Sequence, residues 1–355
     1  MNIDFVEATG IFSGKDTPYF GHLQFWSENK VTGRLTFLIE GCRKIKLHYT
    51  PSTGIMVLSG SIMYFWQGHN FTFKKEGFVE AIDYIGQLLQ IEGKIWEMQI
   101  NILECGVIME VDERPRNYIQ NHREGNGMLL YSNPKDKDNF RSFNDKFAER
   151  KMYDAGRNIQ YKQGIPIKQV IQEEGWNPEG HYLKWEIHYL KPELLNHGIG
   201  IRLAEIVNPH WEEIFREDIY HQYQLITPMK TLLPPSSKAN FSTMDIFAIG
   251  LVESMLNEGH TIEEVKKHLY GIVNSSAILT KSDKDSRKRQ INLTLAKLEQ
   301  SDQSKWDISK KLAEALDLAD TSTAIASDRH SDDNEDRDGS RDENQQSDSD
   351  PLYCD

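Results

Sequence analysis

The sequence is poor in the features that mark secreted, disulfide-bonded and membrane proteins. Its three cysteines, Cys42, Cys105 and Cys354, are scattered and odd in number, so neither a disulfide framework nor a zinc ribbon is expected. No stretch approaches the roughly twenty consecutive apolar residues of a membrane-spanning helix. The N-terminus, MNIDFVEATGIF, lacks the basic start and apolar run of a signal peptide. These absences predict a soluble, cytoplasmic protein with no membrane partner.

The sequence also lacks the motifs of several large enzyme classes. It contains no GxxxxGKS or GxxxxGKT phosphate-binding loop, no HExxH zinc motif and no GxSxG nucleophile elbow. ATP-driven enzymes and the corresponding hydrolases are therefore disfavoured.

Negative charge is concentrated at the C-terminal end. The 355 residues carry a formal net charge of −13; twelve acids and three arginines in residues 320–355 supply −9 of it, which leaves −4 for residues 1–319. Repeated Ser, Asp and Asn with like charge cannot form a core, so residues 319–355 are expected to be a disordered acidic tail. Such a tail could compete with DNA for a basic surface, or it could equally be a solubilising spacer.

The first half of the sequence is typical of short strands with one helix. Residues 23–28, 34–40, 44–50 and 54–61 are rich in β-branched and aromatic residues, with a hairpin turn expected near Gly41. Residues 76–91 have apolar side chains at helical spacing, and Gly93 is expected to end that helix before a strand over 95–111. This order predicts an α+β fold, in which an antiparallel sheet packs against helices.

The second half predicts further strands and then helices. Strands are expected at 128–132, 150–156 and 181–190, and the composition becomes helical after Gly198. Ser242 with Asp245 and Thr261 with Glu264 have the spacing of capping boxes, and helices are expected at 286–300 and 306–318. We therefore predict an α+β region at 1–200, a helical C-terminal region at 201–318 and the tail at 319–355.

Tyr153 is a candidate nucleophile. It lies beside Asp154 in the run KMYDAGRNIQY, and residues 135–168 hold nine basic and five acidic side chains, an excess that suits a phosphate backbone. A tyrosine near positive charge and an acid or a metal can attack a phosphodiester. The nearby basic residues are Arg150, Lys151, Arg157 and Lys162. The alternative, which these residues alone favour, is an ordinary strand tyrosine on a solvated charged face.

Three residues are candidate metal ligands. Glu186 and His188 are two positions apart in HYLKWEIHYL, so both should point to one face of a strand. Carboxylate and imidazole ligands together suit Mg²⁺ or Mn²⁺ better than a structural zinc. Glu104 is a lone acid in the apolar run NILECGV and needs a metal or a basic partner if it is buried. The alternatives are an exposed strand face for the first pair and a structural salt bridge for Glu104.

A turn rich in aromatic residues is a candidate nucleic-acid contact. Gly68, His69 and Asn70 follow the run SGSIMYFWQ, whose rings could stack on single-stranded bases. Core aromatics beneath a loop would explain the same pattern equally well.

Four runs, taken in order, resemble a known family. GIMVLSGSIMYFWQGHNFTF, INILECGV, KMYDAGRNIQY and LKWEIHYLKPELLNHGIGIRLAEI are similar to segments of the phage and plasmid replication initiators related to the gene II and gene X proteins of filamentous phages. In those relatives the runs are an SGS segment closed by His-Asn, an LExGV strand, a YDKG run, and an LRFEIK strand followed by a Gly-Ile-x-x-Leu segment. The similarity covers about residues 50–210.

The resemblance implies rolling-circle replication initiation by a nuclease-like core. Such an enzyme nicks one strand of DNA, keeps a 5′-phosphotyrosine link, leaves a 3′-OH and later rejoins the ends. The link conserves the phosphodiester, so no ATP is needed, in keeping with the missing phosphate-binding loop. Single-stranded or origin DNA would be the substrate, with a host helicase or polymerase as a further partner.

The roles that the resemblance implies can be assigned to residues of this sequence. Tyr153 would be the nucleophile, with Asp154 and Arg157 beside it. Glu104 and Glu186 would be the acids of a site for Mg²⁺ or Mn²⁺, and His188, a candidate ligand from its strand position rather than from the resemblance, would add to them. The expected DNA contacts are Arg150, Lys151, Lys162, His69 and Asn70.

Two positions depart from the family pattern. Ala155 stands where the relatives have lysine after Tyr-Asp, and His188 stands where they have the lysine of Glu-Ile-Lys. The His-hydrophobe-His metal pair of rolling-circle nucleases is also absent as such. Three hypotheses stay open: a nicking and joining enzyme, a DNA- or RNA-binding protein without cleavage, and a scaffold whose acidic tail recruits host replication proteins.

Overall fold

The computed structural model describes residues 1–39, 42–132, 136, 138–158, 167–229, 243–298, 304 and 306–318. Lys162, Ser242, the turn at Gly41 and the acidic segment 319–355 lie outside these residues. None of the described helices is long and apolar enough to cross a bilayer.

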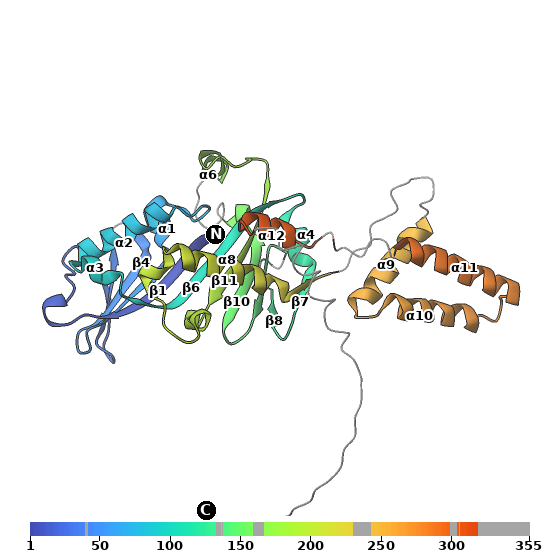
Figure 1. Cartoon of the computed structure of the whole chain (residues 1–355), viewed down its shortest axis with the longest axis horizontal. Coiled ribbons are helices and arrows are strands. Elements are labelled where there is room, and N and C mark those ends of the chain that lie inside the picture. The colour runs from blue at the N-terminus through green and yellow to red at the C-terminus, as the bar shows by residue number, and fades with distance from the viewer. Residues whose placement is uncertain are drawn as a thin grey trace, which may run out of the picture. The chain divides into compact units, whose positions relative to one another are not determined.

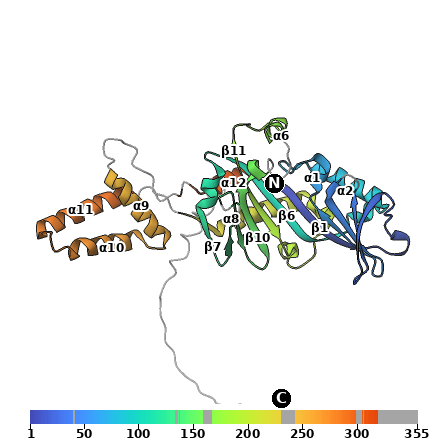
Figure 2. The same cartoon turned by 180° about the vertical axis from the view of Figure 1, so that it is seen from behind.

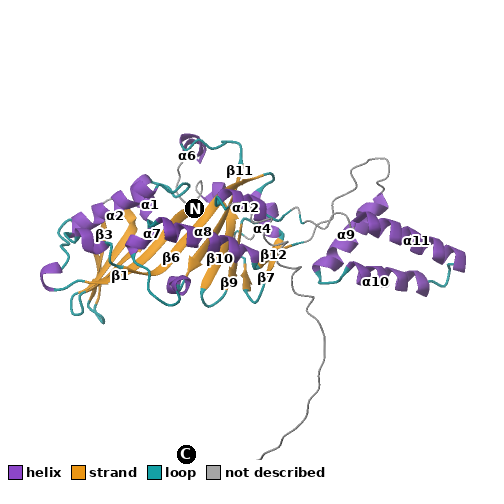
Figure 3. Cartoon of the chain, in the orientation of Figure 1, coloured by secondary structure: helices purple, strands orange, loops and turns teal. Residues whose placement is uncertain are grey.

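Within the described residues, the fold is α+β and is built on one large antiparallel sheet (Figures 1 and 3). In spatial order its strands are β2 (Leu23–Asn29), β3 (Arg34–Ile39), β4 (Cys42–Thr50), β5 (Ile55–Gly60), β1 (Asn2–Ile11), β6 (Gln99–Val111), β11 (His181–Tyr189), β10 (Ala148–Asp154), β9 (Phe140–Asn144) and β8 (Leu129–Tyr131). A separate pair consists of β7 (His122–Gly125) and β12 (Ile226–Pro228). The N-terminal strand β1 thus lies near the middle of the sheet, beside β6.

Helices connect and cover these strands. The α-helices are α1 (Ile62–Gln67), α2 (Lys75–Leu89), α3 (Glu92–Ile95), α4 (Pro115–Gln120), α6 (Ile167–Glu173), α7 (Leu203–Ile206), α8 (Pro209–Gln224), α9 (Thr243–Asn257), α10 (Ile262–Ser275), α11 (Lys281–Leu298) and α12 (Ser309–Ala315). Two short 3₁₀ helices are η1 (Gly14–Asp16) and η2 (Pro192–Asn196).

The main core lies between one face of the sheet and the helices α2, α8 and α12, which cover that face in Figure 1 and lie behind the sheet in Figure 2. Alternate residues of the central strands point into it, because successive side chains of a strand point to opposite faces. Trp185 is the largest fully buried side chain, and its indole Nε1 donates to the Ile219 carbonyl of α8 at 3.1 Å. The other face of the central strands carries the polar residues described below.

The apolar core continues across residue 200, where the sequence suggests a domain boundary. Trp211 and Phe215 of α8 and Leu312 of α12 belong to the same buried cluster as the sheet. By contrast, α9, α10 and α11 have a small core of their own, formed by Val252, Leu256, Val265 and Leu295. The predicted capping box is present, since the side chains of Thr261 and Glu264 each accept the other residue's backbone N–H at the start of α10.

Several element predictions need correction. The helix predicted to end at Gly93 ends at Leu89, because Gln90 takes the left-handed conformation with φ of 56°, and Gly93 lies inside α3. Residues 62–67, expected to belong to a turn rich in aromatic residues, form α1. The strand expected from residue 95 begins at Gln99. Strand β1 was not predicted, and it contributes a central residue to the site.

Candidate active site

The polar face of the central strands gathers ionisable side chains from β1, β6, β11 and β10. On β11, Trp185 and Ile187 are buried in the main core, so Lys184, Glu186 and His188 point to the opposite face. The same alternation places Lys151 and Tyr153 of β10 there, because they pair in register with Glu186 and Lys184.

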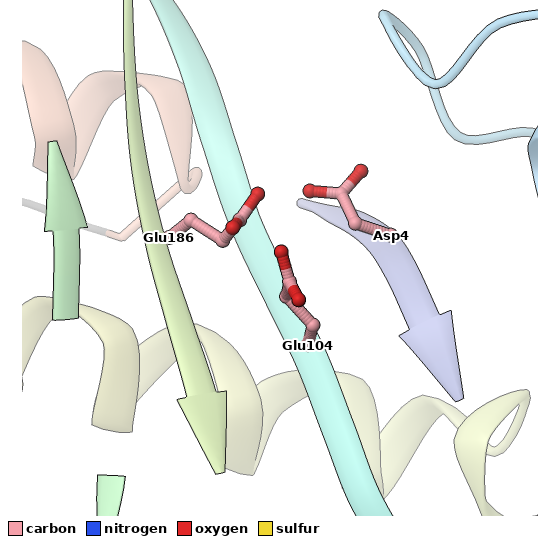
Figure 4. A group of neighbouring side chains, drawn as sticks. All are labelled: Asp4, Glu104 and Glu186. Carbon is pink, nitrogen blue, oxygen red and sulfur yellow. The ribbon is translucent and has the colours of Figure 1, made fainter. Parts of the chain in front are cut away.

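Three carboxylates from three neighbouring strands meet on this face. Asp4 of β1, Glu104 of β6 and Glu186 of β11 each offer an oxygen within 4.8 Å of the others (Figure 4). Asp4 and Glu186 are buried, and the Glu104 side chain is 16% exposed. We call these three residues the carboxylate cluster.

Asp4 reaches the cluster because β1 is irregular at this point. In the pairing with β6, Ile3 lies opposite Cys105 and Phe5 lies opposite Glu104, so Asp4 is an extra residue in β1. A bulge of this kind turns a side chain out of the regular alternation. Ile3 and Val6 therefore both lie in the core although they are three residues apart, and Asp4 between them points to the polar face.

Two lysine ammonium groups neutralise most of the cluster's charge. Lys184 Nζ contacts Asp4 Oδ2 and lies 3.3 Å from Glu186 Oε2, and its side chain is 2% exposed. Lys151 Nζ lies 3.2 Å from Glu104 Oε1 and 3.4 Å from Glu186 Oε1, and its side chain is 16% exposed. Each ammonium therefore bridges two of the three carboxylates, which offsets the high cost of burying them.

Burial and mutual repulsion shift the acidities within the cluster. Loss of water raises the pKa of Asp4 and of Glu104 well above the ordinary range, and the neighbouring Glu186 raises both further. Burial would also raise the pKa of Glu186, but its contacts with Lys184 and Lys151 hold it well below the usual range. Glu186 is therefore the carboxylate most strongly held in its ionised form.

Gly106 makes room for Glu186. It lies directly opposite Glu186 in the β6–β11 pairing. A Cβ atom at this position would stand 2.3 Å from the Trp185 carbonyl oxygen and 2.7 Å from the Glu186 Cα, both backbone atoms. Only glycine therefore allows β6 and β11 to approach this closely behind the cluster.

Tyr153 is bonded directly to the cluster. Its hydroxyl donates a hydrogen bond of 2.7 Å to Glu186 Oε2, and Lys184 Nζ lies 5.9 Å from its ring centre. Burial and the surrounding carboxylates raise the pKa of this phenol well above 10. The hydroxyl is therefore protonated at neutral pH, with a carboxylate in place to accept its proton.

His188 supports Glu104 from the more open side. Its Nδ1 lies 2.9 Å from Glu104 Oε2, and burial together with Lys151 lowers the pKa of the imidazole. When Glu104 is ionised, a neutral ring donates from Nδ1 to its carboxylate, which leaves Nε2 as the acceptor nitrogen. The structure thus brings the three predicted ligands together, but the third member of the cluster is Asp4, while His188 orients Glu104.

The predicted turn after α1 lies at the edge of the site. Asn70 Nδ2 donates to Asp4 Oδ1 at 2.7 Å and so holds the third carboxylate in place. His69 instead accepts the Phe71 backbone N–H at Nδ1, and its Nε2 lies 3.6 Å from Glu174. Asn70 therefore positions a residue of the carboxylate cluster, whereas the contacts of His69 given above are with Phe71 and Glu174 outside the cluster.

A second apolar cluster covers the polar face beside Lys184. It contains Phe71, Ile108, Ala155, Val170, Ile171 and Tyr182, with Trp176 packed against it. Ala155, which stands where the similar family has lysine, is only 2% exposed here. The described cations in contact with the carboxylate cluster are Lys151 and Lys184, and position 155 does not supply one.

An aromatic row leads from the carboxylate cluster to the sheet edge. The ring centres of Tyr153 and Phe140 are 6.4 Å apart and stacked at 25°, and those of Phe140 and Tyr131 are also 6.4 Å apart. These residues belong to the adjacent strands β10, β9 and β8, and Tyr131 is 49% exposed. We call them the aromatic row.

Other predicted site residues lie away from the cluster. Arg150 is 4% exposed on the opposite face of β10, where it contacts Gln222 at 2.7 Å and Asp145 at 3.0 Å. Its predicted role in contacting DNA beside Tyr153 therefore needs correction, because strand alternation points it toward α8. Asp154 accepts the backbone N–H of Arg157 at 2.9 Å, and burial raises the pKa of its carboxyl.

The described basic residues that were predicted to form a surface around Tyr153 also point to different places. Arg157 Nη2 lies 3.1 Å from Asp136, and Lys168 Nζ lies 2.7 Å from Glu179. Arg141 donates to the carbonyls of Gln120 and His122. Of the described basic residues in this stretch, Lys151 is the one in contact with the carboxylate cluster.

Two residues of the site, Asp4 and Lys184, were not predicted. Lys184 had a usable signal, because it shares the two-residue spacing of Glu186 and His188 in HYLKWEIHYL. Asp4 is a lone acid between apolar residues at the N-terminus, but alternation alone would have placed it with the wrong neighbours.

The donor set fits a hard divalent cation. Three carboxylates supply only oxygen ligands, which Mg²⁺, Mn²⁺ and Ca²⁺ prefer, and the site contains no thiolate. The cluster could therefore hold a metal ion beside a hydrogen-bonded tyrosine. No protein-family model, curated protein or solved structure matches this chain.

Proposed function

We propose that this protein is a metal-dependent enzyme that nicks and rejoins single-stranded DNA through Tyr153, as a rolling-circle replication initiator does. The observation that carries this proposal is the 2.7 Å hydrogen bond from the Tyr153 hydroxyl to Glu186, within a cluster of three carboxylates. A phenol beside a candidate metal site and a proton acceptor has the parts that phosphoryl transfer to tyrosine requires.

The four runs that resemble the replication initiators support the same assignment. Each run contributes a residue to the site: Asn70 from the first, Glu104 from the second, Tyr153 from the third and Glu186 from the fourth. These residues are far apart in the sequence, and the sheet brings them into one hydrogen-bonded group. The nuclease-like core expected from the resemblance would then be the central part of this sheet.

The reaction would be a direct exchange of phosphodiester bonds. The Tyr153 oxygen would form a bond to phosphorus as the bond from phosphorus to the 3′-oxygen breaks. Glu186 is placed to accept the phenolic proton, and the 3′-oxygen leaves as a free hydroxyl by taking one proton from water, so that one proton is lost and one gained overall. Rejoining reverses these steps. A bound Mg²⁺ or Mn²⁺ would neutralise charge on the phosphate and lower the pKa of the phenol.

Substrate would approach along the polar face of the sheet. The aromatic row begins at Tyr153 and ends at the half-exposed Tyr131, and aromatic rings on a strand surface stack on unpaired bases without sequence preference. Lys151, at the more open side of the carboxylates, is the cation placed to meet a phosphate. Single-stranded or origin DNA in the cytoplasm is the proposed substrate, and host replication factors are proposed partners.

One observation favours a second candidate, a nucleic-acid-binding protein that no longer cuts. Lys151 and Lys184 already occupy bridging positions among the carboxylates, and Ala155 replaces a cation of the similar family. Such a protein would keep the aromatic row and bind single strands without forming a covalent link.

Covalent capture separates the two candidates. A pool of 3′-labelled single-stranded oligonucleotides is incubated with the protein and Mg²⁺ or Mn²⁺, then run on a denaturing gel. The wild type and the control Tyr131→Phe should form a labelled adduct, and Tyr153→Phe should bind the pool without forming one. Chelation should abolish the adduct and preserve binding. An adduct that persists in Tyr153→Phe would assign the chemistry to another tyrosine.

A further inference from the structure

The cations that neutralise the carboxylate cluster occupy the space a metal ion would need. Lys151 bridges Glu104 and Glu186, and Lys184 bridges Asp4 and Glu186. The two ammonium groups therefore span all three carboxylates whose oxygens lie within 4.8 Å of one another. A cation that coordinates those oxygens must stand close to both ammonium groups.

Charge balance favours the departure of one ammonium. A divalent cation coordinates carboxylates in their ionised form, in which the three carboxylates and two lysines carry one negative charge, and adding the cation to them would make it one positive. Like charges a few ångströms apart in a site with little water repel strongly. Departure of one lysine would make the metal-bound cluster neutral.

Exposure and contacts identify Lys151 as the group that leaves. Its side chain is 16% exposed, against 2% for Lys184, which is enclosed with Asp4 and Glu186. A third carboxylate, Glu149, lies 3.9 Å from Lys151 Nζ on the more exposed side, and its side chain is 32% exposed. Glu149 and Lys151 are two residues apart on β10 and share a face, so the ammonium can move toward Glu149 without any backbone change.

We propose that Lys151 is a resident counter-ion that a divalent cation displaces, so that metal binding moves its ammonium from Glu104 and Glu186 toward Glu149 and the open face. This inference rests on the proposed function, because it requires the carboxylate cluster to bind a metal. It assigns Lys151 a positioning role: the freed ammonium reaches the surface where a substrate phosphate would lie. The centre thereby carries one negative charge without metal, and with metal it becomes neutral and presents an ammonium group to a phosphate.

Amine labelling of the full-length protein measures this displacement. The protein is acetylated briefly with and without Mg²⁺, and modification of each lysine is quantified by mass spectrometry. Modification of Lys151 should increase several-fold with Mg²⁺, while Lys184 stays protected. Modification of Lys146, an exposed lysine just before β10, should stay unchanged. Unchanged modification of Lys151 at saturating Mg²⁺ would overturn the inference.

Calorimetric titration with Mn²⁺ gives an independent readout. Lys151→Met keeps the length of the side chain and removes the competing charge, so Mn²⁺ should bind about tenfold more tightly than to wild type. Lys146→Met is the matched control and should bind like wild type. Equal or weaker binding by folded Lys151→Met would contradict displacement; if that variant does not fold, the labelling experiment decides.

The outcomes distinguish the inference from the proposed function. Mn²⁺ binding that depends on Glu104, together with unchanged Lys151 labelling, would reject the counter-ion role and leave the metal-dependent enzyme standing. Absence of any Mn²⁺ binding to the wild type would reject both.

Discussion

Glu186 makes more of the site's contacts than the other carboxylates do. It touches both lysines, accepts the Tyr153 hydroxyl and is 1% exposed. Groups in such a network cannot be removed singly without leaving a buried charge unpaired. Its charge therefore matters both for stability and for any metal that binds.

Glu186→Gln should separate the effects of the Glu186 charge on stability and on metal binding from the effect of its hydrogen bond. The amide can still accept from Tyr153, but it loses the charge that holds Lys184 and Lys151, so unfolding should become easier by about 3–5 kcal/mol. Mn²⁺ affinity should fall by at least roughly tenfold, because a neutral amide is a weaker ligand for a hard cation. Denaturant unfolding and calorimetry measure both effects, and Glu110→Gln, on an exposed position of β6, is the control. Unchanged Mn²⁺ affinity would exclude Glu186 as a ligand.

Gly106→Ala tests the close approach behind Glu186. The added Cβ would meet backbone atoms at 2.3 and 2.7 Å, so β6 and β11 must separate. The expected cost is about 1–3 kcal/mol of stability, as for overpacking in a core, together with weaker Mn²⁺ binding. Gly93→Ala is the control, since no atom lies within 4 Å of a Cβ there. Equal stability of the Gly106 and Gly93 variants would show that the strands tolerate the side chain.

At the residue scale, the sequence identifies only part of the site. Glu104 was predicted because a lone acid in an apolar strand needs a partner, Glu186 from its two-residue spacing to His188, and Tyr153 and Lys151 from the basic stretch in which they lie. Arg150 was misassigned because the same alternation, applied to β10, points it away from Tyr153. Asp4 was not predictable from alternation, since the bulge that turns it to the polar face depends on the pairing of β1 with β6.

At the scale of elements, a buried hydrogen-bond network joins β7 to α8 and to the segment before α12. His122 Nδ1 lies 2.7 Å from the Tyr118 carbonyl, and its Nε2 lies 2.9 Å from the Tyr223 hydroxyl. The Tyr223 oxygen also accepts the Ile308 backbone N–H at 3.0 Å. A carbonyl can only accept, so His122 donates from Nδ1, and in the neutral ring Nε2 is an acceptor for the Tyr223 hydroxyl, in competition with Asp307 Oδ1 at 3.2 Å.

This network predicts a loss of stability in mild acid. Burial lowers the pKa of His122 from 6.5 to about 4. Between these values the unfolded chain binds the proton and the folded chain does not, so stability is complete above pH 6.5 and falls as the pH drops toward 4, by roughly 3 kcal/mol for this group. Denaturant unfolding across this range should show a shallower pH dependence for His122→Gln than for wild type, whereas the exposed His210→Gln should keep the wild-type slope. Identical slopes for all three proteins would refute the assignment.

The aromatic row makes a second prediction at this scale. Tyr131→Ala removes its most exposed ring, so single-stranded DNA should bind more weakly by about 1–3 kcal/mol, the usual value of one stacked base. Phe25→Ala is the control, because Phe25 is 56% exposed on β2 at the opposite edge of the sheet. Fluorescence anisotropy with a labelled oligonucleotide measures both. Equal losses in the two variants would argue against a specific path along β8 to β10.

Elements with strong periodicity were predictable, and short or mixed ones were not. The apolar spacing of residues 76–91 and the alternation of 181–190 correspond to α2 and β11. The run IMYFWQ is too short and too aromatic to distinguish helix from strand by its sequence, and it forms α1. Strand β1, which lies between β5 and β6 in the sheet, was not predicted.

At the scale of the whole molecule, the site depends on contacts between distant parts of the sequence. Asp4, Glu104 and Glu186 lie on β1, β6 and β11, which are adjacent in the sheet. A family resemblance over residues 50–210 contains two of these carboxylates but not Asp4. The sheet order, which no local pattern specifies, determines that the N-terminal strand completes the cluster.

The most direct test of the account is to identify the residue that becomes attached to DNA. After reaction with single-stranded DNA and Mg²⁺, the adduct is trimmed with nuclease, digested with trypsin and analysed by mass spectrometry. Cleavage after Lys151 and Arg157 releases residues 152–157, MYDAGR, which contain a single tyrosine. We predict a 5′-phosphonucleotide on Tyr153 in this peptide. An unmodified MYDAGR peptide, with the nucleotide on another tyrosine or on none, would contradict the account.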